Sequence, residues 1–165
     1  MVTKLSTRQT ADSSNKIRKA VAEDLHDCIY IGKRFAKESG YEKLKVNVEK
    51  AEATFWSAIE REDTLLLVVE SEGQVVGVFL AMLAPAFFTD VILGVELMWY
   101  VLPEYRGKLG DTPIRILDEY EKWAKAGGAS MINMVNIDLL NGEKVAKIYK
   151  AKGYRLTENT FVKEI

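Results

Sequence analysis

Residues 100–117, YVLPEYRGKLGDTPIRIL, combine features that could bind a phosphate group. An apolar, strand-like run leads into a loop with two basic residues and two glycines, and the loop ends where a helical pattern begins. Glycine lets the backbone approach a ligand closely, and a helix N-terminus offers unpaired N–H groups and the positive end of a dipole. Because Asp111 is also a good N-cap, a turn before a capped helix is the alternative.

Glu96 is the only charged residue in the apolar run VELMWYV (95–101). Burial among such neighbours would raise its pKa toward neutrality and would suit the carboxylate to proton transfer. The alternative is a glutamate on the solvent face of a strand, in contact with water or a lysine.

Other reactive groups are few. Cys28 is the only cysteine, and the helical pattern around it favours a small buried side chain. His26 is the only histidine, and its place on the same helix favours the surface. Since no Ser-His-Asp set, Cys-His set or metal cluster can be assembled, hydrolase and metalloenzyme functions lose most of their support, and no metal is expected.

Composition and charge limit the remaining choices. The chain has 165 residues, 48% of them hydrophobic, and a formal net charge of -1. These values are typical of one globular domain, and they give no electrostatic reason to expect nucleic acid as a partner. The apolar runs are too short for a membrane span, and the polar start lacks a signal peptide's apolar core. We therefore expect a cytoplasmic protein with a mobile segment over 1–14 and a single domain over 15–165.

Hydrophobic periodicity predicts strands and helices in a mixed order. In chain order these are a strand over 15–20, a helix from Glu23 and Asp24 toward Gly40, a helix over 47–61, strands over 64–70 and 74–84 joined by a tight hairpin, a strand over about 91–102, a helix over about 112–126, a strand over 130–137, a helix over 143–152, and short terminal strands in YRLTE (154–158) and TFVKEI (160–165). The first part is antiparallel. The strand, helix and strand over 91–137 predict a right-handed crossover between parallel strands, with the glycine-containing loop at the edge that ligands favour.

Three segments resemble the GNAT superfamily of acyl-CoA-dependent N-acetyltransferases. They are IRKA followed by ED (17–24), VLPEYRG (101–107) and IYKAKGY (148–154), and the resemblance extends from about residue 15 to 165. The paired motifs V-x-P-x-Y-R-G and Y-x-x-x-G-Y carry it. WAK (123–125) and the tail E-x-x-FVK (158–163) look similar to small phage-encoded members. The resemblance implies an α+β, three-layer fold with a mostly antiparallel sheet, a parallel splayed strand pair, and helices on both faces.

The same resemblance implies a coenzyme A site. A bulge in the fourth strand would pair with the pantetheine arm over Trp99–Leu102, and the following loop would hold the pyrophosphate. The implied cofactor-binding residues are Trp99, Tyr100, Val101, Leu102, Arg106, Gly107, Lys108, Gly110 and Asn141. The sequence departs from the family pattern at Leu109 and Asp111, which stand where the family has small residues. It departs again at Glu143, which stands where many members have an asparagine; the asparagine of this chain, Asn141, lies two positions earlier.

Catalytic roles follow from the resemblance as well. Tyr149 matches the tyrosine that protonates the departing thiolate, a task that suits a phenol because it keeps its proton at neutral pH. The alternative is a core tyrosine whose hydroxyl is bonded to backbone. Glu96 is the candidate base that takes a proton from the attacking ammonium, since only the neutral amine is nucleophilic.

The acceptor would lie between two loops, 39–45 and 85–90. Tyr41 belongs to the first loop, and Phe87 and Phe88 would form an apolar wall in the second, unless they pack into the core instead. The predicted function is an acetyl-CoA-dependent N-acetyltransferase that acts on a primary amine of a small molecule, a peptide N-terminus or a lysine, and that could be a homodimer. The alternative is a GNAT-shaped binding or regulatory protein with reduced catalysis, which Leu109, Asp111 and Glu143 favour.

Overall fold

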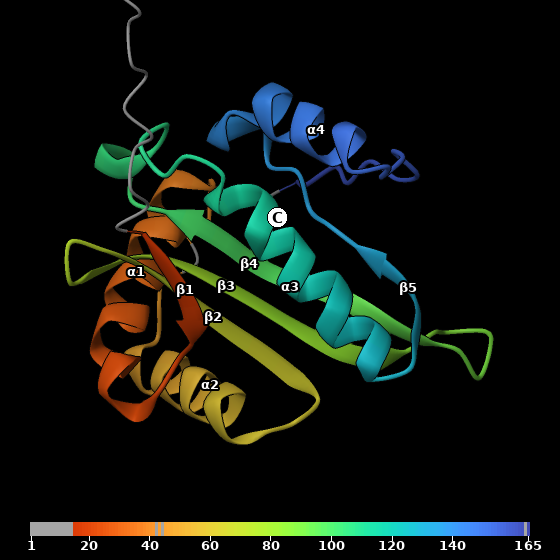
Figure 1. Ribbon diagram of the computed structural model, residues 1–165, viewed down its shortest axis with the longest axis horizontal. Helices are drawn as coiled ribbons and strands as arrows, with labels where there is room; N and C mark the ends of the chain where they lie inside the picture. The colour runs from red at the N-terminus through yellow and green to blue at the C-terminus, as the bar shows by residue number, and fades with distance from the viewer. Residues whose placement is uncertain (1–14, 42, 44, 164) are drawn as a thin grey trace, which may run out of the picture.

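One mixed sheet of five strands organises the chain, in the order β1-β2-β3-β4-β5 (Figure 1). A computed structural model describes residues 15–165 apart from 42, 44 and 164, so the predicted mobile segment 1–14 lies outside the described residues. The elements are β1 (Lys16–Lys19), η1 (Ala22–Asp24), α1 (Leu25–Glu38), α2 (Val48–Glu60), β2 (Thr64–Ser71), β3 (Gln74–Pro85), β4 (Ile92–Val101), η2 (Pro103–Tyr105), α3 (Thr112–Ala126), β5 (Ala129–Asn133), η3 (Asp138–Leu140) and α4 (Gly142–Ala151).

All neighbouring strands are antiparallel except β4 and β5, which are parallel. The crossover through α3 enforces this direction, because a strand, a helix and a second strand return the chain to the same end of the sheet. The tight hairpin predicted between β2 and β3 is confirmed. Glu72 and Gly73 both have positive φ, of 52° and 78°, the geometry that matches the twist of paired strands.

Each face of the sheet carries an apolar core. On one face, Ile31 of α1 and Phe55 of α2 pack with Met98 and Tyr100 of β4. Cys28 is buried in this core, and burial raises the pKa of its thiol to about 12. The predicted mixed sheet with helices on both faces is confirmed.

The second core lies beneath α3. The apolar stripe of α3, formed by Ile116, Leu117, Tyr120 and Ala124, is fully buried. Phe79 of β3 meets the ring of Tyr120 at 5.1 Å between centroids. Among the described helices, none is both long and apolar enough to cross a membrane.

Gly94 lets β5 and α3 approach β4 closely. A Cβ atom there would lie 2.7 Å from Ile132 Cγ2 and 3.0 Å from the Tyr120 hydroxyl. We expect Gly94→Ala to lower the free energy of unfolding by about 1–3 kcal/mol, the usual cost of overpacking, as measured by urea denaturation. Ser130→Ala, at an exposed position of the neighbouring strand, is the control and should change stability little. Equal stability of both variants would contradict this account.

The two predicted terminal strands are wrong. Residues 154–163 contain no helix or strand, and β5 ends at Asn133 rather than at 137. A strand needs a neighbour with which to pair its backbone, and none of the five described strands pairs with this segment.

Candidate functional site

The strands β4 and β5 separate partway along their length. They pair only from Ile92 with Ala129 to Val95 with Asn133, and β4 then continues to Val101. After β5 the chain has no regular structure until η3 begins at Asp138. The second half of β4 therefore has an open edge toward residues 134–137, which run between α3 and α4 (Figure 1).

A β-bulge at Leu97 decides which face Glu96 occupies. Leu80 pairs with Met98 while Ala81 pairs with Glu96, so Leu97 is an extra residue in β4. Without the bulge, Glu96 would lie on the α1 face with Met98 and Tyr100, because alternate residues of a strand share a face. The bulge instead puts Glu96 on the α3 face with Trp99. The predicted position of the bulge, over Trp99–Leu102, is wrong.

Glu96 is buried, with 6% of its surface exposed, so the solvent-face alternative is wrong. Its Oε2 accepts a hydrogen bond from the Val135 amide at 2.8 Å. Burial raises the pKa of the carboxyl to about 7, because the low-dielectric surroundings disfavour the charged form, while the bond from Val135 acts in the opposite direction. A carboxyl with this pKa can exchange a proton at neutral pH.

Tyr149 binds the carbonyl of the same residue, Val135. Its hydroxyl donates to the Val135 carbonyl at 3.0 Å, and its ring lies 6.2 Å from that of Trp99. Burial, followed by the charge of Glu96, raises the pKa of the phenol, so Tyr149 keeps its proton at neutral pH. This is the bond expected for the alternative, a core tyrosine whose hydroxyl is bonded to backbone. The role of Tyr149 as the acid that protonates the thiolate stays a prediction. Sequence reasoning missed Val135, because a backbone partner leaves no signal in side-chain type.

The loop before α3 offers free backbone amides. Gly107 and Gly110 have positive φ, of 78° and 56°, and no atom lies within 4 Å of a Cβ built on either residue. Within the described chain, the amides of 107, 109, 110 and 111 donate no hydrogen bond. Free amides at the N-terminal end of a fifteen-residue helix form a favourable environment for an anion.

Leu109 and Asp111 leave these amides accessible. Leu109 is buried against the α3 core, so its side chain points below the loop. Asp111 is the N-cap residue of α3, but its carboxylate makes no capping bond and lies 3.8 Å from the Arg115 guanidinium. The alternative in which this carboxylate caps the helix is therefore wrong. Its negative charge still lies beside the loop.

Arg106 binds groups at the end of β4 and at the end of α1. Its guanidinium donates to the Val101 carbonyl at 2.9 Å and to Glu38 at 2.8 Å. It also lies 4.9 Å from the ring centre of Tyr100, whose hydroxyl donates to Glu38. A pyrophosphate contact by Arg106 stays a prediction. Glu38 was missed because nothing in its helical surroundings distinguishes it from a solvated glutamate.

Alternate residues of β4 direct their backbone N–H and C=O groups toward its open edge. The Leu102 amide donates to Val76 of β3, so Leu102 cannot pair with a ligand through that group. In an antiparallel ladder, alternate residues direct their backbone groups to opposite sides, so Tyr100 also bonds toward β3, and Trp99 and Val101 face the open edge. Asn141, with φ of 63° at the start of α4, makes no capping bond through its side chain, and its cofactor role stays a prediction.

The two predicted acceptor loops lie at opposite ends of β4. Phe87 and Phe88 precede its first residue; they are 91% and 90% exposed and contact each other at 4.6 Å between centroids. Tyr41 follows α1, whose last residue, Glu38, binds Arg106 beyond the end of β4. One acceptor cannot be framed by both loops. The alternative that the phenylalanines pack into the core is wrong as well.

Comparison with solved structures identifies the fold as that of the GNAT acetyltransferases. A predicted acetyltransferase from Clostridium acetobutylicum, solved with acetyl-CoA, aligns with a TM-score of 0.71 at 19% identity over 91% of this chain and 96% of its own. Glucosamine-6-phosphate N-acetyltransferase from Arabidopsis thaliana aligns at 0.63 and 19% identity, over 91% and 97%. A transcriptional regulator from Bacillus halodurans aligns at 0.71 and 15% identity, over 92% and 99%.

At such low identities the likeness concerns the fold alone. No protein-family model matches the sequence, and no curated protein matches it. The expected likeness to phage-encoded members finds no support among these structures.

Proposed function

We propose that this chain is an acetyl-CoA-dependent N-acetyltransferase that acetylates a primary amine by direct attack in a ternary complex. The observation that carries the proposal is the second half of β4, which does not pair with β5, with a loop of free amides after its end and the buried Glu96 and Tyr149 side chains bonded to the backbone of Val135. The loop suits a pyrophosphate, and the backbone of Trp99 and the amide of Val101 at the open edge suit the amide groups of a pantetheine arm, while the Val101 carbonyl is bonded to Arg106.

The two buried side chains can play opposite roles in proton transfer. At neutral pH Glu96 can accept a proton, because its pKa is about 7, and Tyr149 has a proton to donate, because its pKa is raised. When bound, acetyl-CoA supplies an acetyl group activated as a thioester. Glu96 accepts a proton from the substrate ammonium, which makes the amine nucleophilic as its nitrogen bonds to the acetyl carbon. Tyr149 donates its proton to the sulfur as the carbon–sulfur bond breaks, and the second proton that the nitrogen releases as the amide forms returns to the phenolate. For this step the hydroxyl must leave the Val135 carbonyl and turn toward the sulfur.

The alternative is a GNAT-shaped binding or regulatory protein with reduced catalysis. It is favoured by the negative charge of Asp111 beside the free amides and by the bond that already occupies the Tyr149 hydroxyl. Binding of acetyl-CoA followed by an assay for released coenzyme A with a panel of primary amines separates an enzyme from a protein that only binds.

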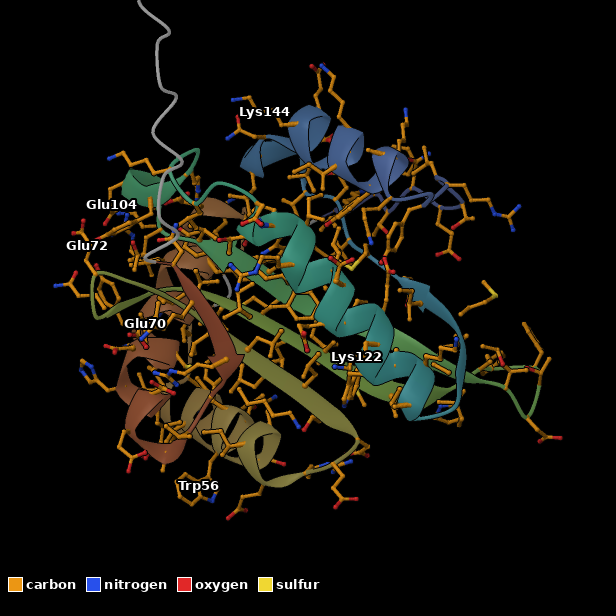
Figure 2. The ribbon with its side chains drawn as sticks, viewed as in Figure 1. Trp56, Glu70, Glu72, Glu104, Lys122 and Lys144 are labelled. Carbon is orange, nitrogen blue, oxygen red and sulfur yellow. The ribbon has the colours of Figure 1, made fainter. Side chains whose placement is uncertain are left out.

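We expect acetyl-CoA to raise the melting temperature by several degrees. Ligand at a hundredfold its Kd stabilises a fold by about 2.7 kcal/mol. Lys108→Glu, in the loop, should remove most of this rise because it adds negative charge beside the pyrophosphate. Lys122→Glu is the matched control, since Lys122 lies on α3 away from the loop (Figure 2).

Wild-type protein that shows no shift at millimolar acetyl-CoA would contradict the proposal. So would equal loss of the shift in both lysine variants, because a general charge effect would then explain it. Arg106→Glu is a poor test, since the new carboxylate would face Glu38 and destabilise the fold itself.

A further inference from the structure

Four side chains meet where α1 and β4 end. The carboxylate of Glu38, the last residue of α1, accepts hydrogen bonds from the Arg106 guanidinium at 2.8 Å and from the Tyr100 hydroxyl at 2.7 Å. The Arg34 guanidinium lies 3.7 Å from the same carboxylate. Burial would raise the pKa of Glu38, but its bonds to Tyr100 and Arg106 hold that pKa below its ordinary value, so the carboxylate is charged at neutral pH.

The helix α1 gives this carboxylate a fixed position. Cys28 and Ile31 of α1 are fully buried in the core, and the Phe35 ring contacts that of Tyr100 at 5.9 Å between centroids. The helix dipole disfavours a negative charge at a C-terminal end. The helix therefore gains nothing from the charge of Glu38 itself, and the stabilisation of this charge comes from the groups that it binds.

Arg106 connects Glu38 to the loop before α3. It is the first residue of the loop and directly precedes Gly107, which has a positive φ. Its Nε donates to the Val101 carbonyl, and its Nη2 binds Glu38. Within the described chain, no other side chain of this loop makes a polar bond to a strand or to α1. The loop is thus held at its start by Arg106 and from below by the buried Leu109.

The position of this loop matters because its backbone amides would bind the pyrophosphate. Such a site is effective only when its N–H groups converge on the anion, and surrounding side chains keep them in place. Glu38 would not bind the anion itself, since like charges repel. Arg106 already bonds toward Val101 and Glu38 through two of its three guanidinium nitrogens.

We propose that Glu38 is a positioning residue of the coenzyme A site, which holds Arg106 and thereby fixes the loop of free amides in the geometry that binds the pyrophosphate. The inference rests on the proposed function, because it concerns the same cofactor site. Tyr100 adds to the effect. Its ring centre lies 4.9 Å from the Arg106 guanidinium, and its hydroxyl holds the carboxylate from the side of β4.

Calorimetric titration with coenzyme A tests this role. Glu38→Ala should weaken the affinity about tenfold, because it removes the charged acceptor that holds Arg106. Glu38→Gln keeps one acceptor oxygen and should bind with intermediate affinity. Glu60→Ala is the matched control, since Glu60 is the exposed last residue of α2, and it should bind normally. Circular dichroism checks that the variants keep their fold.

A double-mutant cycle shows whether Glu38 acts through Arg106. Arg106→Ala should weaken the binding of coenzyme A as well, and the addition of Glu38→Ala to this variant should cause little further loss. A further loss as large as that of Glu38→Ala alone would overturn the inference, because Glu38 would then act independently of Arg106.

The same titrations separate the inference from the proposed function. Equal binding of coenzyme A by wild type and Glu38→Ala would overturn the inference alone. Tighter binding by Glu38→Ala would overturn it too, because Glu38 would then withhold Arg106 from the pyrophosphate. Wild-type protein that binds no coenzyme A would overturn the proposed function, and the inference with it.

Discussion

Tyr149→Phe is expected to lower single-turnover acetyl transfer by about 10- to 1,000-fold, the usual contribution of general acid catalysis. The substitution keeps the ring, and with it the contacts to Trp99 and Tyr154. It removes the only group on that side chain that can protonate the departing sulfur. The Michaelis constants should change little, because the hydroxyl acts in the transition state.

The same substitution also tests the structural role of the hydroxyl. It leaves the Val135 carbonyl without its donor at 3.0 Å, which should cost about 1–3 kcal/mol of stability. Tyr154→Phe is the matched control, since the Tyr154 hydroxyl donates to Glu121 on α3 instead. Normal turnover together with lowered stability in Tyr149→Phe would contradict the catalytic role and leave Tyr149 as a core residue.

Glu96→Gln is expected to stabilise the fold in a pH-dependent way, by up to about 3 kcal/mol above pH 7. The folded-state pKa of Glu96 is raised from its ordinary value of 4.5 to about 7. Between these values the unfolded chain loses the proton while the folded chain keeps it, so wild-type stability falls as pH rises. Below the unfolded pKa both states are protonated, and the variant should gain nothing there.

Urea denaturation of wild type and Glu96→Gln from pH 4 to pH 8 measures this difference. Glu119→Gln, at an exposed position of α3, is the control and should show no comparable gain. In kinetics, wild-type acetyl transfer should increase through about pH 7 as Glu96 ionises, and the variant should lack this rise. A difference in stability that does not depend on pH would show that Glu96 is not held with a raised pKa.

Local periodicity was enough to predict most elements. The helix expected over 112–126 is α3 with the same bounds, and the strand expected over 64–70 is β2, which extends one residue further to Ser71. These patterns are local, because a helix or a strand buries one face at a fixed spacing of residues. The order of the elements also predicted the parallel β4 and β5, since a crossover connection restricts strand direction.

Terminal strands could not be judged from local pattern alone. YRLTE and TFVKEI have strand-like composition, yet 154–163 contains no strand. Strand formation depends on an edge at the right place, and such an edge is a property of the assembled sheet. The two loops predicted to frame the acceptor, 39–45 and 85–90, were misjudged for the same reason. Their distance from each other depends on the assembled sheet, in which the length of β4 separates them.

The sequence by itself determined the elements, their order, the glycine-containing loop before α3 and the presence of Glu96 in an apolar strand. Only the tertiary structure decided where Glu96 points. One extra residue at Leu97 moves that side chain to the α3 face, where it accepts a hydrogen bond from the amide of Val135, the residue whose carbonyl binds Tyr149. A bulge arises from the pairing of β3 with β4, so the face on which Glu96 lies is set by contacts between distant segments and not by the residues around it.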